Sequence, residues 1–530
     1  MEHKKDFIEE NISEKSYSLK ELDKVTLVLS AGFLLVFVIF TIIDSGFMTK
    51  VVNLGFKYST QFFGAYWQIL LLATFIIGLV LAISTGGNAV LGRTKDGKPE
   101  MSTFKWLSII MCTLLAGGGV FWAGAEPIAH FMSPDPMFAV TSDPFQKAVN
   151  ALSTSFMHWG FLAWAILGTL TTIVLMHLHY DKGLPLKPRT ILYPLFGQKI
   201  IDSWVGSVVD AFCIVGAAAG TIGPIGFLGL QISYGLKFLF HVPDNFTAQV
   251  IIVLAAMLIY TVSALTGLAK GITFLSKWNT ILAIFLMVFI FLFGPTKFII
   301  DSFTQGLGSV IEHLVPMALY RGDTSWVNAW TVFFWGWFMG FGPIMAVFMS
   351  TITRGRSVRT LILAVSVLAP LITFFWYTIV GGSGLAAEIA HPGIISGPFT
   401  GFNLPAALLA ITEALPWGTL MSILFLLLSV AFIVTTGDSI TYTISVVTGG
   451  GRHPHPYLRA FWGILMGAMA IALISIGSSG VSAIQSFIII AAVPVSIIIL
   501  PTLWNGPQLA MKMAREQEKE AREGKDPRKA

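Results

Sequence analysis

The sequence is poor in charge and in cysteine. Only 12% of its 530 residues are Asp, Glu, Lys or Arg, whereas 55% are hydrophobic. A soluble domain carries about twice that share of charge, and a mean hydropathy of +0.76 excludes one globule that faces water on all sides. Both cysteines, Cys112 and Cys213, lie in apolar runs, where packing is expected in place of a disulfide. These features predict a polytopic membrane protein.

Catalytic and nucleotide-binding motifs are also scarce. The chain has no HExxH pattern, and 87–94 only imitates a phosphate-binding loop, since Arg93 replaces the essential lysine and a membrane helix precedes it. An enzyme and an ATP-driven pump are therefore not expected. The net charge of +5 follows from the loops and gives no reason to expect nucleic acid.

Long apolar runs recur along the whole chain, each about the 20 residues that a helix needs to cross a bilayer. We predict an all-α fold with a transporter domain over 25–505, between polar tails at 1–24 and 506–530, and no cleavable signal peptide. The twelve predicted transmembrane helices cover 25–43, 66–85, 104–127, 148–177, 203–234, 249–268, 278–297, 326–352, 359–381, 417–439, 458–477 and 481–503. The more polar segment 298–325 is expected to be an interfacial helix.

The distribution of basic residues predicts the orientation of the chain in the membrane. The even-numbered loops hold 15 Lys and Arg residues and the odd-numbered loops hold 6. Because basic loops stay on the cytoplasmic side, the even loops and both tails are expected in the cytoplasm. The last tail pairs Lys512 with Glu516 and Glu518 with Arg522 at helical spacing, which favours a solvated helix.

Glycine is concentrated in two apolar spans. The third span contains Gly117, Gly118 and Gly119, and the eighth reads "FFWGWFMGFGP" over 333–343. Glycine and proline weaken a helix, so the sequence predicts broken spans whose free backbone groups line a binding site. The two spans are five apart, as in inverted repeats. The alternative is close helix packing through small residues.

Aromatic residues surround these glycines. Trp337 and Phe338 share helical faces with Phe341 in the eighth span, and Trp159 and Trp164 lie in the fourth. Aromatic faces bind a quaternary ammonium group, although each ring alone also suits ordinary packing. In the tenth span, Thr435 and Thr436 offer hydroxyl oxygens to a hard cation such as sodium; the alternative is a hydrogen bond back to their own helix.

These residues resemble the betaine/carnitine/choline transporter (BCCT) family along the whole chain. The matching motifs, in order, are "FWAGAEPIAHF" (121–131), "HWGFLAW" (158–164), "KGLPLKPRTILYPLFG" (182–197), "VVDAFCIVG" (208–216), "LGLQISYGLKFLF" (228–240), "WTVFFWGWFMGFGP" (330–343), "ITRGRSVR" (352–359) and "FIVTTGDS" (432–439). The resemblance implies a LeuT-type fold, in which spans 3–7 and 8–12 form inverted repeats behind two extra helices. It also implies a homotrimer in the cell membrane that imports a solute of the glycine betaine, choline or carnitine type, often in osmotic protection.

Site residues follow from the same resemblance. It implies an aromatic box of Trp159, Trp164 and Phe338, with Phe341 nearby and Trp335 and Trp337 around it. It implies a sodium site formed by Phe432, Thr435 and Thr436 with backbone carbonyls near Ala116, Gly117, Gly118 and Gly119.

Three positions depart from the family pattern. Leu167 replaces a tyrosine, Phe338 and Phe341 replace tryptophans, and Gly223-Pro224 stands where Ser/Thr hydroxyls of a second sodium site are usual. The sequence therefore favours symport with sodium through one site and no organic cofactor. A sodium-independent exchanger, a channel and a solute sensor are the alternatives.

Overall fold

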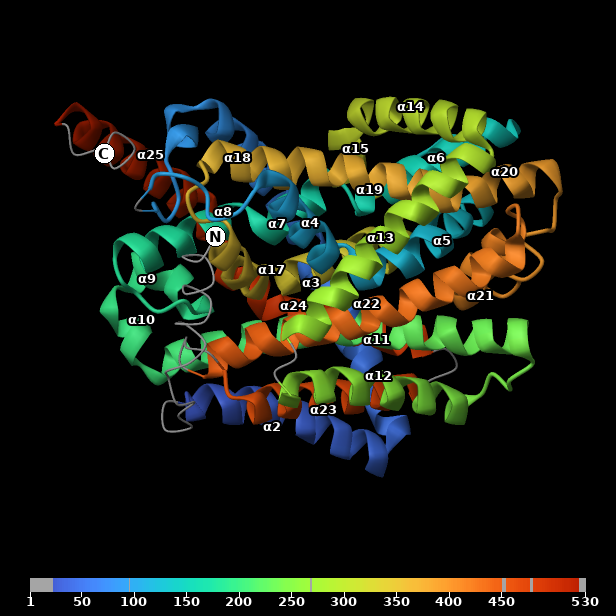
Figure 1. Cartoon of the computed structure of the whole chain (residues 1–530), viewed down its shortest axis with the longest axis horizontal. Helices are drawn as coiled ribbons and strands as arrows, with labels where there is room; N and C mark the ends of the chain where they lie inside the picture. Colours follow the sequence, from blue (N-terminus) through green and yellow to red (C-terminus); the bar gives the residue numbers. More distant parts are fainter. Residues whose placement is uncertain (1–21, 95, 267–268, 450–453, 477–479, 524–530) are drawn as a thin grey trace.

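The computed structural model describes residues 22–94, 96–266, 269–449, 454–476 and 480–523 (Figure 1). Within these ranges the chain is helical, and extended pairing is limited to one antiparallel bridge between Val90 and Ser357. The all-α prediction is confirmed for this part of the chain. A backbone that lies in hydrocarbon must pair its own N–H and C=O groups, and helices do so within one segment.

The α-helices of the first half are α2 (Lys24–Ile43), α3 (Ser45–Ile83), α4 (Thr103–Leu114), α5 (Ala116–Met132), α6 (Pro144–His158), α7 (Phe161–Gly168), α8 (Leu170–Met176), α9 (Tyr193–Phe196), α10 (Gln198–Asp202), α11 (Trp204–Phe240), α12 (Phe246–Thr266) and α13 (Ala269–Phe293). Those of the second half are α14 (Thr296–Glu312), α15 (Leu314–Leu319), α16 (Thr324–Val327), α17 (Phe333–Ile352), α18 (Val358–Leu363), α19 (Ala369–Tyr377), α20 (Ser383–Ala390), α21 (Leu404–Glu413), α22 (Gly418–Thr448), α23 (Pro456–Ile474), α24 (Gly480–Ile499) and α25 (Thr502–Arg522). Short 3₁₀ or π segments join some of them: η2 (Thr85–Asn88), η3 (His177–Asp181), η4 (Pro188–Leu192), η5 (Asn328–Val332), η6 (Ala364–Leu368) and η7 (Thr378–Gly382).

The number of membrane spans differs from the prediction. Ten described helical segments are long and apolar enough to cross a membrane, and an eleventh results if α13 and α14 are counted together. Twelve spans were predicted. The predicted third span is divided at Leu115 into α4 and α5, and neither half reaches the required length alone. Helix α14 turns 106° away from α13, as befits a segment too polar to continue the span.

The eighth span is not broken, so that prediction is wrong. Helix α17 continues through Gly336, Gly340, Gly342 and Pro343. Its glycines serve close packing: a Cβ atom on Gly216 of α11 would lie 2.7 Å from the Gly340 carbonyl oxygen, and one on Gly340 would touch Ala492 of α24. Burial against α11 and α24 stabilises the helix more than the glycines weaken it, since tertiary packing overrides propensity.

Besides the division of the third span at Leu115, a second interruption lies in the fourth span. Helix α6 ends at His158 and α7 begins at Phe161, with Trp159 and Gly160 between them. A Cβ on Gly160 would lie 2.1 Å from the Phe156 carbonyl oxygen and 2.6 Å from the Phe374 ring, so the chain can make this step only with glycine there. The break leaves the Trp159 side chain at the end of a helix in the protein interior.

The helices divide into a group at the periphery of the molecule and a group in its interior. Helices α2, α12 and α23 run along one long edge of the molecule, and α14 and α18 to α20 along the opposite edge (Figure 1). Helices α11, α17 and α24 pack on one another in the interior, where α17 is almost wholly buried. The outer helices α2, α3, α12 and α13 carry many exposed apolar side chains, as expected of surfaces that contact lipid.

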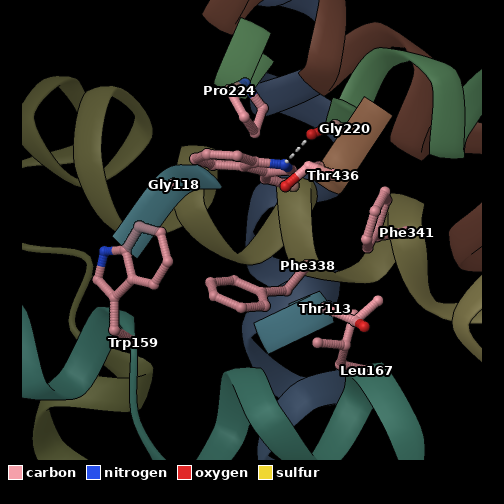
Figure 2. Close-up of a pocket in the computed structure, with 10 residues that line it drawn as sticks. Thr113, Gly118, Trp159, Leu167, Gly220, Pro224, Phe338, Phe341 and Thr436 are labelled. Carbon is pink, nitrogen blue, oxygen red and sulfur yellow. Dashed lines mark hydrogen bonds between the residues drawn. The ribbon is translucent and has the colours of Figure 1, made fainter. Parts of the chain in front are cut away.

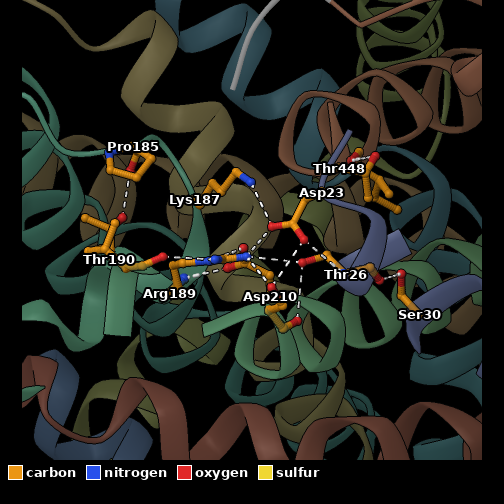
Figure 3. Close-up of polar contacts among 12 residues, drawn as sticks. Asp23, Thr26, Ser30, Pro185, Lys187, Arg189, Thr190, Asp210 and Thr448 are labelled. Atoms are coloured by element: carbon orange, nitrogen blue, oxygen red, sulfur yellow. Dashed lines mark hydrogen bonds and ion pairs between the residues drawn. The ribbon is translucent and has the colours of Figure 1, made fainter. Parts of the chain in front are cut away.

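A buried polar network joins the start of α2 to the interior (Figure 3). Asp23 accepts hydrogen bonds from Lys187 (3.1 Å) and from Arg189, whose Nε also pairs with Asp210 at 2.7 Å. The backbone N–H of Asp23 donates to the Thr448 carbonyl oxygen at the end of α22 (2.9 Å). The network therefore ties α2, the 182–192 loop, α11 and α22 together.

The charges of this network depend on one another. Burial raises the pKa of Asp23, but the Thr26 N–H and the charges of Lys187 and Arg189 outweigh burial and lower that pKa from 3.8 to about 2. Because the folded-state pKa is depressed, the contribution to stability is complete above about pH 4 and is lost as the pH falls toward 2.

We predict that Arg189→Ala lowers the free energy of unfolding by about 3–5 kcal/mol, because the fully buried Asp210 loses its counter-ion. Thermal unfolding of the purified protein in detergent measures the change. Lys297→Ala is the control, since it breaks the exposed pair with Asp301 and should leave the midpoint unchanged. Equal effects of the two substitutions would contradict the role of the network.

Candidate functional site

A small cavity lies where α17 crosses α5, α7, α11 and α22 (Figure 2). Aromatic rings, glycine backbone and short side chains line it, and none of the lining residues is ionisable. The lining residues are Thr113, Gly118, Trp159, Leu167, Gly220, Pro224, Trp337, Phe338, Phe341 and Thr436. Such a cavity suits a ligand that needs contact with π-faces more than it needs a counter-ion.

Three rings enclose one side of the cavity. The Trp159 ring lies edge-to-face against Trp337, with centroids 5.7 Å apart, and against Phe338, with centroids 5.2 Å apart. Phe341 lies on another side of the cavity, beyond Phe338 (Figure 2). Edge-to-face contacts of this length are favourable, so the rings hold one another in place.

The indole N–H groups of the two tryptophans that line the cavity both donate hydrogen bonds. Trp337 Nε1 donates to the Gly220 carbonyl oxygen at 2.9 Å, and Trp159 Nε1 donates to Glu126 Oε2 at 2.7 Å. These bonds fix the ring orientations and leave the carbon atoms of the rings to meet a ligand.

Glycines give the rings their space. A Cβ on Gly118 would lie 2.7 Å from the rings of both Trp159 and Trp337. A Cβ on Gly220 would lie 2.6 Å from Phe341 and 3.3 Å from Trp337 Nε1. Gly118 of α5 therefore acts at the site by admitting the two rings, and the interruption of this span lies just before the glycines, at Leu115.

The structure brings together four of the six residues predicted to bind the solute. Trp159, Trp337, Phe338 and Phe341 line the cavity. Trp164 and Trp335 are fully buried but are not among its lining residues. Trp164 is on the same span as Trp159, but the interruption of the helix at Gly160 separates the two rings.

The residues predicted to bind sodium are spread along α5 and α22. Gly118 and Thr436 line the cavity, and the buried Thr436 hydroxyl has no hydrogen-bond partner among the described residues. The Thr435 hydroxyl instead donates to the Ala431 carbonyl oxygen at 2.9 Å. Phe432 is buried one turn before Thr436, and Ala116 and Gly117 form the first turn of α5.

Sequence reasoning did not assign three further lining positions to the site. Thr113, Gly220 and Pro224 face the cavity from α4 and α11. Gly220 lies in the small-residue run "GAAAGTIGP", which signals a close helix contact without saying what makes it. Glu126 lies in the motif "FWAGAEPIAHF", but only the fold shows that it bonds to Trp159.

Residues 25–518 match the family described as "BCCT, betaine/carnitine/choline family transporter". The chain belongs to this family. It is therefore a multi-pass membrane transporter and not an enzyme, as the sequence motifs indicated.

Curated relatives match over nearly the full length. Glycine betaine transporter 2 of Vibrio parahaemolyticus is 58% identical over 497 residues, which are 94% of this chain and 92% of that protein. Glycine betaine transporter OpuD of Bacillus subtilis is 31% identical over 490 residues (91% and 93%). An ectoine/hydroxyectoine transporter of Virgibacillus pantothenticus is 31% identical over 472 residues (88% and 92%).

We predict that Gly118→Ala weakens solute binding by about tenfold or more, because the added methyl group must displace the Trp159 and Trp337 rings. The change is measured as the solute concentration that half-saturates the thermal stabilisation of the protein. Gly32→Ala, which meets nothing within 4 Å, is the matched control and should bind as the wild type does. Unaltered affinity in Gly118→Ala would show that the solute does not use these rings.

Proposed function

We propose that this transporter imports glycine betaine, or a related solute with a quaternary ammonium group, together with sodium by alternating access. The single observation that carries the proposal is the ring-lined cavity without an ionisable lining residue. A trimethylammonium head has no proton to donate, so hydrogen-bond acceptors gain little from it. Each aromatic face adds about 0.5–2 kcal/mol when the contact is desolvated.

The relatives support the same solute class. Two are named glycine betaine transporters, and the one at 58% identity covers nearly the whole chain. The relative named for ectoine and hydroxyectoine is only 31% identical. We therefore place glycine betaine before ectoine as the solute.

Thr436 supports sodium as the coupling ion. Its hydroxyl oxygen is buried at the cavity and bonds to no described protein group. An unpaired buried hydroxyl costs about 1–3 kcal/mol unless a partner supplies the missing contact, and sodium favours oxygen ligands of this kind. Gly118 of α5 lines the same cavity.

The arrangement in the membrane completes the proposal. We propose a transporter domain over 25–505, with the tails 1–24 and 506–530 and the basic even-numbered loops in the cytoplasm. Three copies are proposed to associate in the lipid bilayer, as the family resemblance implies. Cross-linking in native membranes measures this number, and a species larger or smaller than a trimer would contradict it.

Uptake of labelled glycine betaine into proteoliposomes tests the function. We predict saturable uptake that an inward sodium gradient stimulates and that unlabelled choline, carnitine or betaine reduces to different degrees. Uptake that needs internal solute but not sodium would identify an exchanger. Stabilisation by the solute without any flux would identify a sensor.

We predict that Thr436→Ala abolishes the stimulation by sodium but leaves the protein folded, since the hydroxyl bonds to no group in the part of the chain that the structure describes. The sodium concentration dependence of uptake provides the measurement. Thr441→Ala is the control on the same helix, because the Thr441 hydroxyl bonds back to the Asp438 carbonyl oxygen at 2.8 Å. If Thr436→Ala keeps full sodium dependence, the ion binds elsewhere.

A further inference from the structure

Three ionisable side chains meet in the protein interior behind the aromatic box. Glu126 Oε1 lies 2.6 Å from His158 Nδ1 and 3.1 Å from His130 Nε2. The side chains are at most 1% exposed. Glu126 and His130 are one turn apart on α5, and His158 is the last residue of α6. The proposed uptake mechanism does not use this cluster.

One carboxylate connects the cluster to the cavity. While Glu126 Oε1 faces the two imidazoles, Oε2 accepts the Trp159 indole N–H at 2.7 Å. Trp159 lines the cavity and directly follows His158 in the chain. A change in charge on Glu126 therefore acts on a ring that faces the solute without any intervening group.

The hydrogen bonds of the cluster are compatible with two protonation states, which differ by one proton. With Glu126 ionised and both imidazoles neutral, its two oxygens accept from Trp159, His158 and His130. The Thr331 hydroxyl, 3.0 Å from His158 Nε2, then donates to that nitrogen. When His158 takes up a proton, the same hydroxyl turns and accepts from Nε2–H, so no heavy atom has to move.

The two states differ in net charge, from −1 to zero. No Lys or Arg among the described residues forms an ion pair with Glu126. Its ionisable partners there are the two histidines. A net negative charge in a site of low dielectric constant is costly, and a nearby cationic head offsets that cost. A proton and a quaternary ammonium group are therefore alternative partners for one buried negative charge.

Other ionisable groups lie on the helices packed on α5 and α6 and in the segment that joins these two helices. The Tyr377 ring of α19 lies tilted beside Trp159, with ring centroids 5.5 Å apart, and Lys147 of α6 lies over the Phe131 ring at 4.4 Å. Lys105, Lys237 and Glu312 are exposed. Several others have partners of their own: Asp135 with the Thr154 hydroxyl, Asp210 with Arg189, Asp301 with Lys297, Glu388 with the backbone N–H of 393, 395 and 396, Glu413 with Ser422, Asp438 with Arg459, and His313 with the Ser309 carbonyl oxygen.

The same three residues resemble a set of metal ligands, but the geometry favours a proton. Ligands that surround zinc at about 2.0–2.2 Å lie more than about 3 Å from one another. The 2.6 Å between Glu126 Oε1 and His158 Nδ1 is too close for two ligands of one zinc ion and is the distance of a short hydrogen bond.

We propose that Glu126, His130 and His158 form a proton-binding site that is linked to the solute cavity through Trp159. The proposal rests on the quaternary ammonium solute proposed above. The protonated, neutral cluster binds the solute more weakly, and binding of the solute releases the proton to solvent. Acid therefore weakens solute affinity, and by linkage the solute lowers the affinity for the proton by the same factor.

The test combines solute binding with intrinsic tryptophan fluorescence of the purified full chain at fixed sodium concentration. Between about pH 8.5 and 5.5, glycine betaine affinity is expected to fall by about tenfold, which is a usual size for coupling between sites. Glu126→Gln removes this pH dependence. Glu413→Gln changes a carboxyl that bonds to Ser422, on a helix packed against α5, and should keep it.

Fluorescence without solute keeps the proton site testable by itself. We expect a pH-dependent component that is lost in both Glu126→Gln and Trp159→Phe. If Glu126→Gln does not fold, Thr331→Val is the second variant. It removes the hydroxyl that accepts from the protonated His158 ring, so the midpoint of the pH-dependent fluorescence change should move to lower pH. The absence of the component in the wild type, or its persistence in Glu126→Gln, overturns the proton site.

Failure of the proposed function has a different signature. If no quaternary amine binds at any pH while the fluorescence component is present, the solute class is wrong and the proton site remains. If the solute binds with the same affinity at every pH, the solute class is right and the linkage is wrong.

Discussion

The site depends on a steric constraint: Trp337 needs backbone without side chains on both sides of its ring. A Cβ on Gly118 would lie 2.7 Å from that ring, and a Cβ on Gly220 would lie 3.3 Å from its nitrogen. With both positions bare, the indole N–H reaches the Gly220 carbonyl oxygen at 2.9 Å and the ring rests edge-to-face on Trp159. The Phe338 ring in turn lies edge-to-face on Trp159.

Glycine also allows the close packing of the buried helix α17. Gly216 and Gly340 let α11 and α17 approach each other, and the bulk of α17 is buried by these contacts. Dense packing of this kind fixes the aromatic rings before the solute arrives, which lowers the entropic cost of binding. Beneath the rings, the Glu126 carboxyl group lies one indole away from the cavity.

Composition and motifs predicted more of the fold than of the site. The length of the apolar runs identified a helical membrane protein, because few other structures satisfy their backbone hydrogen bonds in hydrocarbon. The glycine content of α17 led to the wrong prediction of a broken helix. The loss of helix stability caused by Gly340 and Pro343 is outweighed by packing against α11 and α24, which the local sequence does not reveal. The break at Trp159-Gly160 was missed because one glycine is a weak signal by itself.

At the site, the aromatic positions 159, 337, 338 and 341 could be predicted because a run of rings beside glycines is unusual in a span. Trp164 and Trp335 carry the same signal but pack elsewhere, since ring direction depends on the break in span four and on the rotation of α17. Contacts between distant segments, such as Glu126 with Trp159 and His158, appear only once the chain is folded.

An experimental density map of the protein with bound glycine betaine would show where the solute lies relative to these rings. We expect density for the trimethylammonium head between Trp159, Trp337 and Phe338, with Gly118 and Gly220 behind the rings. A solute bound outside this cavity, or held by an ionised side chain in place of the rings, would contradict it.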